Sequence, residues 1–308
     1  MQEKPTISVT ITTYNRAHLL PRAINSVLNQ TYQNFELIIV DDCSTDNTKE
    51  VINTFSDSRI IYHRHTKNKG LLAATNTGWE LTRGKYTCKL DDDDELLPNA
   101  LEIVNKKFSE LNQKGVKFLW FNCINAEMGK LCSIGLKKEG YITYEDVLSS
   151  KVQGDFWQVI DMELLGENRY NEGWWGGSGI LWLRLLRKSM GYYIPETLYK
   201  AYRKHGVRMT FDRKSIIQHL SKILLLEMTF LEENGRDLKR LAPKKYGLKL
   251  NELGFYQMLK GDINDGRKTF YEAFKFHFSF KYFILFLFSF LIKSKQLKIF
   301  YIKFFNIG

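Results

Sequence analysis

The chain has 308 residues and a mass of 36.2 kDa, enough for one large α/β domain with a smaller appendage and an extensive buried core. Its net charge is +11, and residues 243–308 carry +8 of it, from 12 Lys or Arg against 4 Asp or Glu. Because those lysines alternate with long apolar runs, the charge argues against a hydrophilic nucleic-acid-binding arm and favours a negatively charged membrane surface as a partner.

Two sequence features bear on the cellular compartment. The cysteines at positions 43, 88, 123 and 132 show neither C-x-x-C spacing nor the framework of a small secreted domain, which predicts reduced thiols. The chain runs almost directly into the apolar residues 7–11, without the basic and apolar segments of a signal peptide. We therefore expect the folded part to lie in the cytoplasm.

The first hundred residues alternate short β-branched runs with segments of helical period. Residues 7–12, 35–40, 59–63 and 85–90 are typical of strands, and the apolar spacing from Leu19 to Leu28 predicts a helix with one buried face. Residues 44–46 (STD) begin a second predicted helix, where a small polar residue can cap the free amides. This alternation predicts a mainly parallel sheet with helices on both faces, in which ligands bind beyond the carboxyl ends of the strands.

Polar side chains follow three of these predicted strands. Thr12–Asn15 follow the first, Asp41 and Asp42 the second, and Asp91–Asp94 the fourth. Four consecutive carboxylates repel one another, so such a run usually persists because a divalent cation and a phosphorylated ligand bind there. The alternative is a solvated acidic turn that caps a helix starting near Pro98. The carboxylate pair at a second strand end favours a shared ligand crevice.

Residues 116–202 are less regular and richer in aromatic residues and glycine. Residues 117–122 are typical of a buried strand, and residues 174–179 of a glycine-rich loop whose backbone approaches another group closely. Residues 180–188 predict a helix that ends at Gly191–Pro195. We expect the acceptor side of a site in this region.

Beyond Thr210 the pattern is helical throughout. Seven small or apolar positions have the spacing of a single tetratricopeptide-like helical hairpin: Leu250, Leu253, Gly254, Gly261, Gly266, Phe270 and Ala273. One copy cannot form an array, so we interpret the hairpin as a packing appendage rather than a peptide receptor.

The C-terminal tail contains an uncharged apolar run, residues 282–292, with Lys281 before it and Lys293, Lys295 and Lys298 after it. A membrane-spanning helix needs about 20 apolar residues, so this run is too short to span. We expect it to lie in a membrane interface, with its aromatic side chains among the headgroups and its lysines on phosphates. The alternative is a short helix buried against the preceding domain.

Five blocks of sequence, taken together and in order, resemble the amino-terminal half of the inverting nucleotide-sugar glycosyltransferases called family 2, which share the GT-A fold. The blocks are residues 7–16 (ISVTITTYNR), 26–31 (SVLNQT), 35–42 (FELIIVDD), 68–70 with Asn76, and 90–98 (LDDDDELLP). Residues 181–184 (LWLR), 194–196 (IPE) and 202–205 (YRKH) are similar to the second half of the family pattern.

The resemblance implies an α/β fold of the Rossmann-like GT-A type, with a mainly parallel sheet and helices on both faces. The GT-A domain would cover residues 1–210, with a nucleotide-binding half at 1–115 and an acceptor-binding half at 116–210. Residues 211–308 would form a helical C-terminal region that ends in a basic, aromatic, membrane-associating tail.

The resemblance also implies a donor site. The residues that it assigns to nucleotide-sugar binding are Thr12, Tyr14, Asn15, Asp42, Asn76, Asp91 and Asp92. Thr12 and Tyr14 would line the base pocket, and Asp42 would accept a hydrogen bond from the ring N–H of the base. Asp91 would face the ribose.

A metal ion belongs to the same implied site. Asp93, with Asp91, would hold Mn²⁺ or Mg²⁺ on the diphosphate, and His205 would be a further ligand. Asp92 and Asp94 have weaker claims, as supporting or capping residues. Arg203, Lys204 and Arg208 either contact the diphosphate or form a solvated basic face.

The sequence departs from the family at the general base. Relatives carry Asp or Glu six residues before the Arg of the Leu-Trp-Leu-Arg block, and here that position is Ser178. A serine hydroxyl is too weak a base without an activating partner. Three explanations stay open: an engineered variant whose base was removed, a relative that uses Glu172, Asp155 or Asp161, or a natural non-catalytic binder.

These features predict a metal-dependent inverting glycosyltransferase that moves a sugar from a nucleotide diphosphate donor, by default a UDP-sugar, to an acceptor hydroxyl. The basic, aromatic tail suggests a lipid-linked or glycan acceptor, as in lipid-linked oligosaccharide or surface polysaccharide synthesis, and a peripheral position on the inner face of the cell membrane. Trp174 and Trp175 would stack on an acceptor sugar, or simply pack.

Two other functions compete with this prediction. A catalytically impaired nucleotide-sugar-binding protein is favoured by Ser178. A nucleotidyltransferase would be expected to carry a glycine-rich, basic phosphate loop after the first strand, and residues 13–16 are not one.

Overall fold

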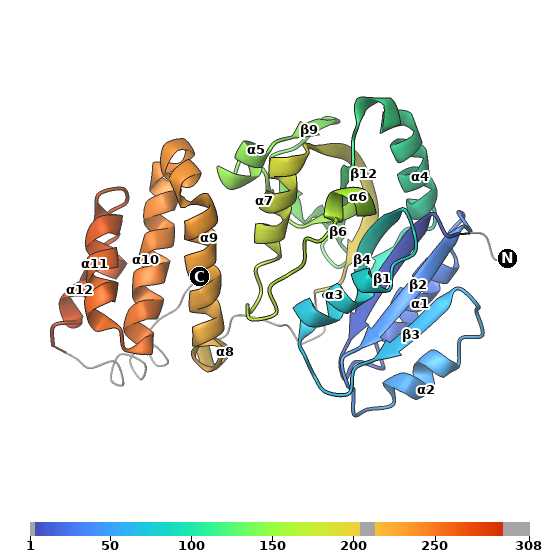
Figure 1. Cartoon of the computed structure of the whole chain (residues 1–308), viewed down its shortest axis with the longest axis horizontal. Helices are drawn as coiled ribbons and strands as arrows, with labels where there is room; N and C mark the ends of the chain where they lie inside the picture. Colours follow the sequence, from blue (N-terminus) through green and yellow to red (C-terminus); the bar gives the residue numbers. More distant parts are fainter. Residues whose placement is uncertain (1–3, 204–212, 292–308) are drawn as a thin grey trace. The chain divides into compact units, whose positions relative to one another are not determined.

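The computed structural model describes residues 4–203 and 213–291, which divide into two compact units (Figure 1). The first unit consists of Met1–Glu172 and Leu181–Gly206, and the second of Gly173–Ile180 and Val207–Gly308. Lys204, His205 and Arg208, which the sequence analysis singled out, lie outside the described residues.

A mixed, mostly parallel sheet forms the centre of the first unit, with the strand order β3-β2-β1-β4-β11-β6-β12-β5. The pairs β1–β2, β2–β3, β1–β4 and β6–β12 are parallel, whereas β11 runs antiparallel between β4 and β6. The strands on this path are β1 (Ile7–Thr13), β2 (Phe35–Asp41), β3 (Ile60–Arg64), β4 (Tyr86–Asp91), β5 (Glu95–Leu96), β6 (Phe118–Asn125), β11 (Phe156–Asp161) and β12 (Gly191–Ala201).

Four further short strands are found among the described residues of this unit. Strand β7 pairs with β6, β9 pairs with β12, and β8 and β10 form a separate two-stranded sheet. Their bounds are β7 (Lys130–Leu131), β8 (Ser133–Ile134), β9 (Gly140–Ile142) and β10 (Gln153–Gly154).

Helices cover both faces of the sheet. One face packs against α1, α2 and α4 in the largest hydrophobic cluster, and the other packs against α3, α6 and α7 in two further clusters. The α-helices are α1 (Leu20–Leu28), α2 (Thr48–Asn53), α3 (Leu71–Glu80), α4 (Ala100–Leu111), α5 (Tyr144–Leu148), α6 (Met162–Leu165) and α7 (Ser178–Lys188), and a short 3₁₀ helix covers Asn112–Lys114. The first three residues of α7 belong to the second unit. The predicted fold class is confirmed.

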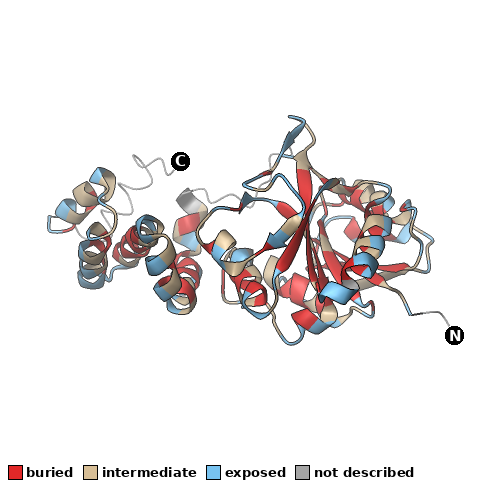
Figure 2. Cartoon of the chain, turned by 90° about the horizontal axis from the view of Figure 1, so that it is seen from above, coloured by how far each residue is buried: buried red, intermediate tan, exposed pale blue. Residues whose placement is uncertain are grey.

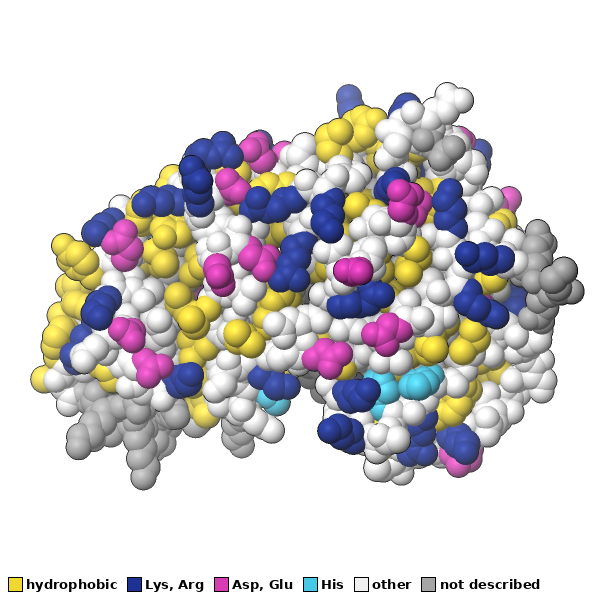
Figure 3. All heavy atoms as spheres, viewed as in Figure 1, with side chains coloured by type: hydrophobic (Ala, Val, Ile, Leu, Met, Phe, Trp, Pro, Cys, Tyr) yellow, Lys and Arg dark blue, Asp and Glu magenta, His cyan; other side chains and the backbone are white. Residues whose placement is uncertain are grey.

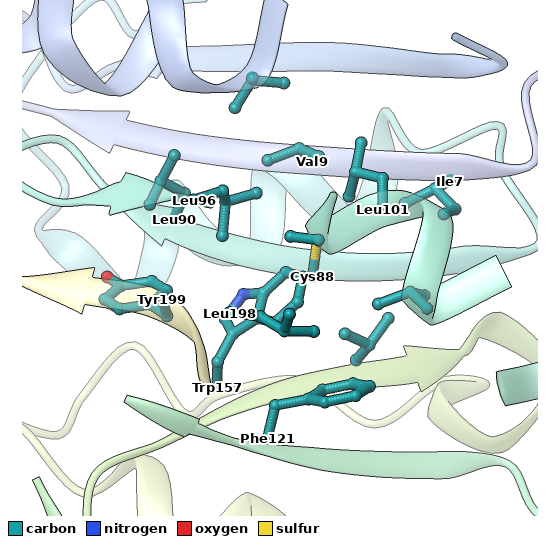
Figure 4. Close-up of a cluster of buried hydrophobic side chains, with 14 of the residues drawn as sticks. Ile7, Val9, Cys88, Leu90, Leu96, Leu101, Phe121, Trp157, Leu198 and Tyr199 are labelled. Atoms are coloured by element: carbon teal, nitrogen blue, oxygen red, sulfur yellow. The ribbon is translucent and has the colours of Figure 1, made fainter. Parts of the chain in front are cut away.

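The core explains why these strands form. Every residue of β1 and β2 is buried, as expected for parallel strands covered on both faces, and Figure 2 shows the sheet buried along its length. Figure 4 shows side chains from β1, β4, β6, β11 and β12 meeting in the largest cluster, including Val9, Leu90, Trp157 and Tyr199. The sheet therefore holds the loops that follow its strands in fixed positions.

Helix α3 approaches β1 very closely at one glycine. A Cβ atom on Gly78 would lie 2.2 Å from Cγ2 of Thr10, in the middle of β1. Only a residue without a side chain lets the helix lie at this depth, which brings its first turn to the end of β2.

The second unit is helical. It contains α8 (Arg213–Gln218), α9 (Leu220–Leu241), α10 (Pro243–Lys260), α11 (Ile263–Phe274) and α12 (Phe280–Phe288). The expected hairpin is formed by α10 and α11, which approach through glycines: a Cβ on Gly254 would lie 3.0 Å from the carbonyl oxygen of Gly266. The cluster at its centre includes Phe255, Met258, Phe270 and Leu285.

Two sequence expectations were wrong in detail. Helix α2 begins at Thr48 rather than within residues 44–46, with Asn47 as its N-cap. Asp46, from the expected segment, accepts the N–H of Thr48 at 3.2 Å. Residues 191–195 do not merely end α7, because they are the first residues of β12, which runs on to Ala201.

All four cysteines are free thiols. No helix in residues 4–203 and 213–291 combines the length and hydropathy needed to cross a bilayer.

Candidate active site

Three strands end side by side at one edge of the sheet. Strand β1 lies between β2 and β4, with Thr13 opposite Asp41 and Thr12 opposite Asp91. The carboxyl ends of these parallel strands therefore meet, and the polar residues that follow them form one site. This edge is where ligands bind in open α/β sheets.

The first strand end carries an open aromatic ring and a buried hydroxyl. Tyr14 is 44% exposed, although it follows a fully buried strand. The hydroxyl of Thr12 is buried and has no hydrogen-bond partner among the described residues. A buried hydroxyl without a partner leaves a donor and an acceptor to be satisfied by water or by a ligand.

Asn15 joins two loops of the site. It adopts a left-handed conformation with φ 54°, its N–H donates to Oγ of Ser44 at 2.9 Å, and its Oδ1 accepts the N–H of Thr45 at 2.7 Å. Asn tolerates this conformation better than most residues. In this structure the side chain fixes the loop after β1 to the loop after β2, and a contact with a donor stays a prediction.

Asp42 is buried and holds a neighbouring loop. Its carboxylate accepts the N–H groups of Lys69 at 2.8 Å and Gly70 at 2.7 Å, and Nδ1 of His65 lies 2.7 Å from it. These contacts fix Gly70, the N-cap of α3, at the end of β2. A carboxylate has about four acceptor positions, so one is left for another donor.

The acidic run places three carboxylates close together. Ligand oxygens of Asp91, Asp93 and Asp94 all lie within 4.8 Å of one another. An all-oxygen donor set that is partly open to solvent is what Mg²⁺ and Mn²⁺ prefer, so these residues fit a hard divalent cation. His205, the predicted fourth ligand, lies outside the described residues.

The three carboxylates differ in their environment. The Lys89 ammonium, 2.7 Å from Asp91, lowers the pKa of that carboxyl, with smaller effects from Arg16 and Arg203. Burial, followed by repulsion from Asp91, raises the pKa of Asp94 to about 7. Asp94 accepts the hydroxyl of Tyr199 at 2.7 Å and the N–H of Tyr202 at 2.7 Å. Below about pH 7, a cation that bound here would displace the proton of Asp94.

Asp92 faces away from this group and into the loop after β1. It accepts the hydroxyl of Thr13 and Nη1 of Arg16, both at 2.7 Å, and Nη2 of the same guanidinium is bonded to Asp93. Burial raises the pKa of Asp92 to about 6, although Arg16 and Thr13 act against the rise. Asp92 therefore ties the acidic turn to β1.

Strand β12 supplies the other side of the acidic site. The hydroxyl of Tyr199 donates to Asp94 and accepts the N–H of Asp91 at 3.2 Å. Two residues after its end, Arg203 forms an ion pair with Asp155 at 2.5 Å, and its N–H donates to Glu127. Residues about a hundred positions later in the chain thus complete the site.

Asn76 clamps a segment that leads to a candidate base. Its side-chain amide donates to the carbonyl of Tyr170 and accepts the N–H of the same residue, both at 2.9 Å, and its Nδ2 lies 3.5 Å from Oε1 of Glu172. The Tyr170 ring stacks on Trp79, and burial, with the charge of Asp91, raises the pKa of its hydroxyl. Glu172 itself is exposed.

Two of the other carboxylates weighed as the base are engaged elsewhere. Asp155 is paired with Arg203. Asp161 is opposite Tyr86, at the start of β4, and caps α6 by accepting the N–H of Glu163 at 2.8 Å. Five residues of strand separate Tyr86 from Asp91, about 16 Å. Asp161 is therefore at the wrong end of the sheet for a base, and that expectation is corrected.

The loop before α7 belongs to the second unit. Ser178 is the first residue of α7. Trp174 is buried, Trp175 stacks on His219 with ring centroids 4.9 Å apart, and a Cβ on Gly177 would lie 2.2 Å from Leu226. These contacts favour the packing interpretation for Trp174, whereas acceptor binding by Trp175 stays a prediction.

Sequence reasoning overlooked several members of the site. Arg16 and Lys89 pair with carboxylates of the acidic run, and the hydroxyl of Tyr199 donates to it. The signal for Arg16 was present, because it ends the first family block. No local signal marks Tyr199, because only the pairing of β12 with β5 and β6 brings it to Asp94.

Comparison with known proteins gives independent findings. Residues 8–128 match the family model described as Glycosyl transferase family 2. The chain is similar to the GalNAc(5)-diNAcBac-PP-undecaprenol beta-1,3-glucosyltransferase of Campylobacter jejuni, with 31% identity over 254 residues, covering 79% of this chain and 81% of that protein. It is also similar to the UDP-Glc:alpha-D-GlcNAc-diphosphoundecaprenol beta-1,3-glucosyltransferase WfgD of Escherichia coli, with 34% identity over 163 residues, 52% of this chain and 61% of that protein.

Among solved structures, S. aureus TarS 1–349 in complex with UDP-GlcNAc superposes with a TM-score of 0.61 and 15% identity, covering 87% of this chain and 89% of that chain. At this identity the likeness is one of fold.

Proposed function

Because the chain belongs to the family 2 glycosyltransferases, we propose that it transfers a sugar from a UDP-sugar to a hydroxyl of a lipid-linked saccharide, with inversion at the anomeric carbon. The observation that carries the proposal is the meeting of β1, β2 and β4 at a group of three carboxylates beside an exposed tyrosine ring. Relatives named for diphosphoundecaprenol-linked acceptors support the choice of acceptor.

The donor base would lie at the end of β1. Tyr14 offers an exposed ring for stacking, and the unpartnered hydroxyl of Thr12 can hydrogen-bond to the base. Asp42 would contribute its remaining acceptor position while it keeps the Lys69–Gly70 loop in place. Asn15 and Asn76 would act on the donor mainly by holding these loops.

The diphosphate would lie over the acidic group. Asp93, Asp91 and Asp94 would hold Mn²⁺ or Mg²⁺, which neutralises the charge that develops on the departing UDP. Tyr199 orients Asp94 and thereby keeps its oxygens directed at the group. Arg203, whose charge reaches Asp91, would add a positive charge beside the diphosphate.

Inversion requires a base on the face opposite the leaving group. Ser178 occupies the family position, and of the described carboxylates considered above Glu172 is the one that is exposed and attached to the Tyr170 segment. We infer that Glu172 takes the acceptor proton. The second candidate function, a nucleotide-sugar binder without turnover, is favoured by Ser178 alone.

The outer surface of the second unit suits a membrane surface. Figure 3 shows hydrophobic side chains at the left edge of the view, over α11 and α12, with lysines, arginines and some acidic side chains between them. In α12 and the turn after it, Phe280 is 70% exposed, Phe290 60% and Leu291 80%, whereas Leu285 is buried against the unit's own core. We propose that this surface rests on the inner face of the cell membrane, where it would bring the site within reach of a lipid-linked acceptor.

Vesicle binding tests the membrane proposal. The double variant Phe280→Ser, Leu291→Ser should lose most of its binding to vesicles that contain anionic lipid, because each of these side chains contributes about 1.5–3 kcal/mol when buried. Its thermal stability should stay unchanged, because both side chains are exposed. Equal vesicle binding by the variant and the unmodified protein would contradict the proposal.

A transfer assay tests the enzyme proposal. The protein is incubated with UDP-glucose, UDP-GlcNAc or UDP-GalNAc, Mn²⁺ and a polyprenyl-diphosphate-linked GlcNAc acceptor, and UDP release and the anomeric configuration of the product are measured. Asp93→Asn should abolish turnover, whereas Asp57→Asn, which removes an equally half-buried carboxylate paired with Arg59, should not. UDP binding without transfer or hydrolysis would favour the binder, and neither binding nor transfer would refute both.

A further inference from the structure

The acidic site already contains its own cations. Arg16 donates to Asp92 at 2.7 Å and to Asp93, and Lys89 lies 2.7 Å from Asp91. Two of the three carboxylates that fit a divalent cation are therefore paired with a protein cation in this structure. A guanidinium and a divalent cation cannot share one carboxylate oxygen without strong repulsion.

The two carboxylates on Arg16 are held unequally. Asp92 is almost fully buried, and its second oxygen accepts the hydroxyl of Thr13, so this pairing belongs to the framework of the loop. The side chain of Asp93 is 19% exposed and belongs to the carboxylate group. The contact between Nη2 and Asp93 can therefore break while Nη1 stays bonded to Asp92.

A second observation concerns the same guanidinium. Its Nε–H is buried and has no hydrogen-bond partner among the described residues, although Arg16 carries five donors in a rigid fork. The present arrangement therefore leaves part of the side chain without an acceptor. A diphosphate would supply acceptor oxygens for donors that carboxylates do not fill.

We propose that Arg16 is a built-in counter-ion that occupies Asp93 until the donor and a divalent cation arrive together, and that it then turns from Asp93 to the negative charge of the donor. The inference rests on the proposed function and adds a coupling to it: Arg16 makes the free protein a poor metal binder and makes nucleotide and metal bind cooperatively. By linkage, UDP strengthens Mn²⁺ binding by the same factor by which Mn²⁺ strengthens UDP binding.

Metal titration without any sugar transfer tests the proposal. Mn²⁺ binding is measured at pH 7.5, with and without UDP, by the loss of the free-ion electron paramagnetic resonance signal. Without UDP, Arg16→Gln should bind Mn²⁺ about tenfold more tightly than the unmodified protein, the scale of one charge-assisted hydrogen bond. With Mn²⁺ present, the same variant should bind UDP about tenfold more weakly, so that the cooperativity between UDP and Mn²⁺ falls about tenfold.

Two further variants complete the design. Arg59→Gln removes an arginine of nearly equal exposure that pairs with Asp57 away from the site, and it should behave as the unmodified protein. Arg16→Lys keeps the charge without the fork and should give intermediate values, which protects the test if Arg16→Gln does not fold.

The proposal is overturned if Arg16→Gln and Arg16→Lys bind Mn²⁺ no more tightly than the unmodified protein in the absence of UDP. If the unmodified protein transfers sugar and that result is still found, only the role of Arg16 fails. If no protein binds Mn²⁺ even with UDP, the metal site and the role of Arg16 fail together, and the transfer assay decides the enzyme proposal separately.

Discussion

The hydroxyl of Tyr199 offers a sharp test of how the acidic site is built. It donates to the carboxylate of Asp94 at 2.7 Å and accepts the N–H of Asp91 at 3.2 Å, in a part of the core where Tyr199 is only 7% exposed. Tyr199→Phe keeps the ring, which lies in the largest hydrophobic cluster (Figure 4), and removes both bonds. One of them is to a charged group.

The expected cost depends on pH. A hydrogen bond to an ionised carboxylate contributes about 1.5–3 kcal/mol and a neutral one about 1 kcal/mol, so Tyr199→Phe should destabilise the metal-free protein by about 2–4 kcal/mol at pH 8. At pH 5.5 Asp94 is protonated, because its pKa is about 7, and both lost bonds are then neutral. The cost should fall to about 1–2 kcal/mol.

The direction follows from proton linkage. The folded-state pKa of Asp94 lies above its usual value of 3.8, so its contribution to stability is complete below about pH 4 and is lost as the pH rises through about 7. The Tyr199 bond lowers this pKa. Removing the bond raises the pKa further, so the variant loses more stability than the unmodified protein between these pH values.

Urea unfolding in EDTA at pH 5.5 and pH 8, followed by intrinsic fluorescence, measures the effect. Tyr193→Phe is the matched control, because it lies on the same strand, is 1% exposed, and donates to the neutral Oδ1 of Asn122 at 3.0 Å. It should cost about 1 kcal/mol at both pH values. An equal cost of Tyr199→Phe at both pH values would refute the reasoning, because Asp94 would then not change its charge in this range.

Three further predictions concern the base, a helix cap and the packing of α3. Glu172→Gln should lower sugar transfer at least about a hundredfold, the scale of general-base catalysis, and an unchanged rate would remove Glu172 from the mechanism. Asp161→Ala should lower the free energy of unfolding in urea by about 1 kcal/mol, because α6 loses its cap. The transfer rate should stay unchanged, since Asp161 lies opposite the start of β4, and a large loss of rate would make Asp161 a candidate base again. Gly78→Ala should destabilise the protein by about 1–3 kcal/mol, because its Cβ would lie 2.2 Å from Thr10. Gly140→Ala, whose Cβ would have no atom within 4 Å, should leave the stability unchanged. Equal stability of the two variants would contradict the packing of α3 on β1.

Periodicity and short motifs predicted much of the first unit. The β-branched runs before Thr12, Asp41 and Asp91 are local signals, and each became a strand within one or two residues of its expected bounds. The helical region after residue 213 and the hairpin of α10 and α11 were also local, because glycine and apolar spacing reports a packed helix pair directly. The family pattern added the fold type and the candidate donor residues.

The sequence by itself therefore determined the helices and strands, and the strand ends that carry carboxylates, because these features depend on neighbours within a few positions. The tertiary structure alone decided which charges meet: β12 crosses beside β5 and β6 to bring Tyr199 to Asp94, the loop after β1 turns Arg16 onto Asp92 and Asp93, and α3 clamps Tyr170 through Asn76. Electrostatic pairing falls off over a few ångströms in space and has no fixed spacing in sequence, so no local pattern reports it.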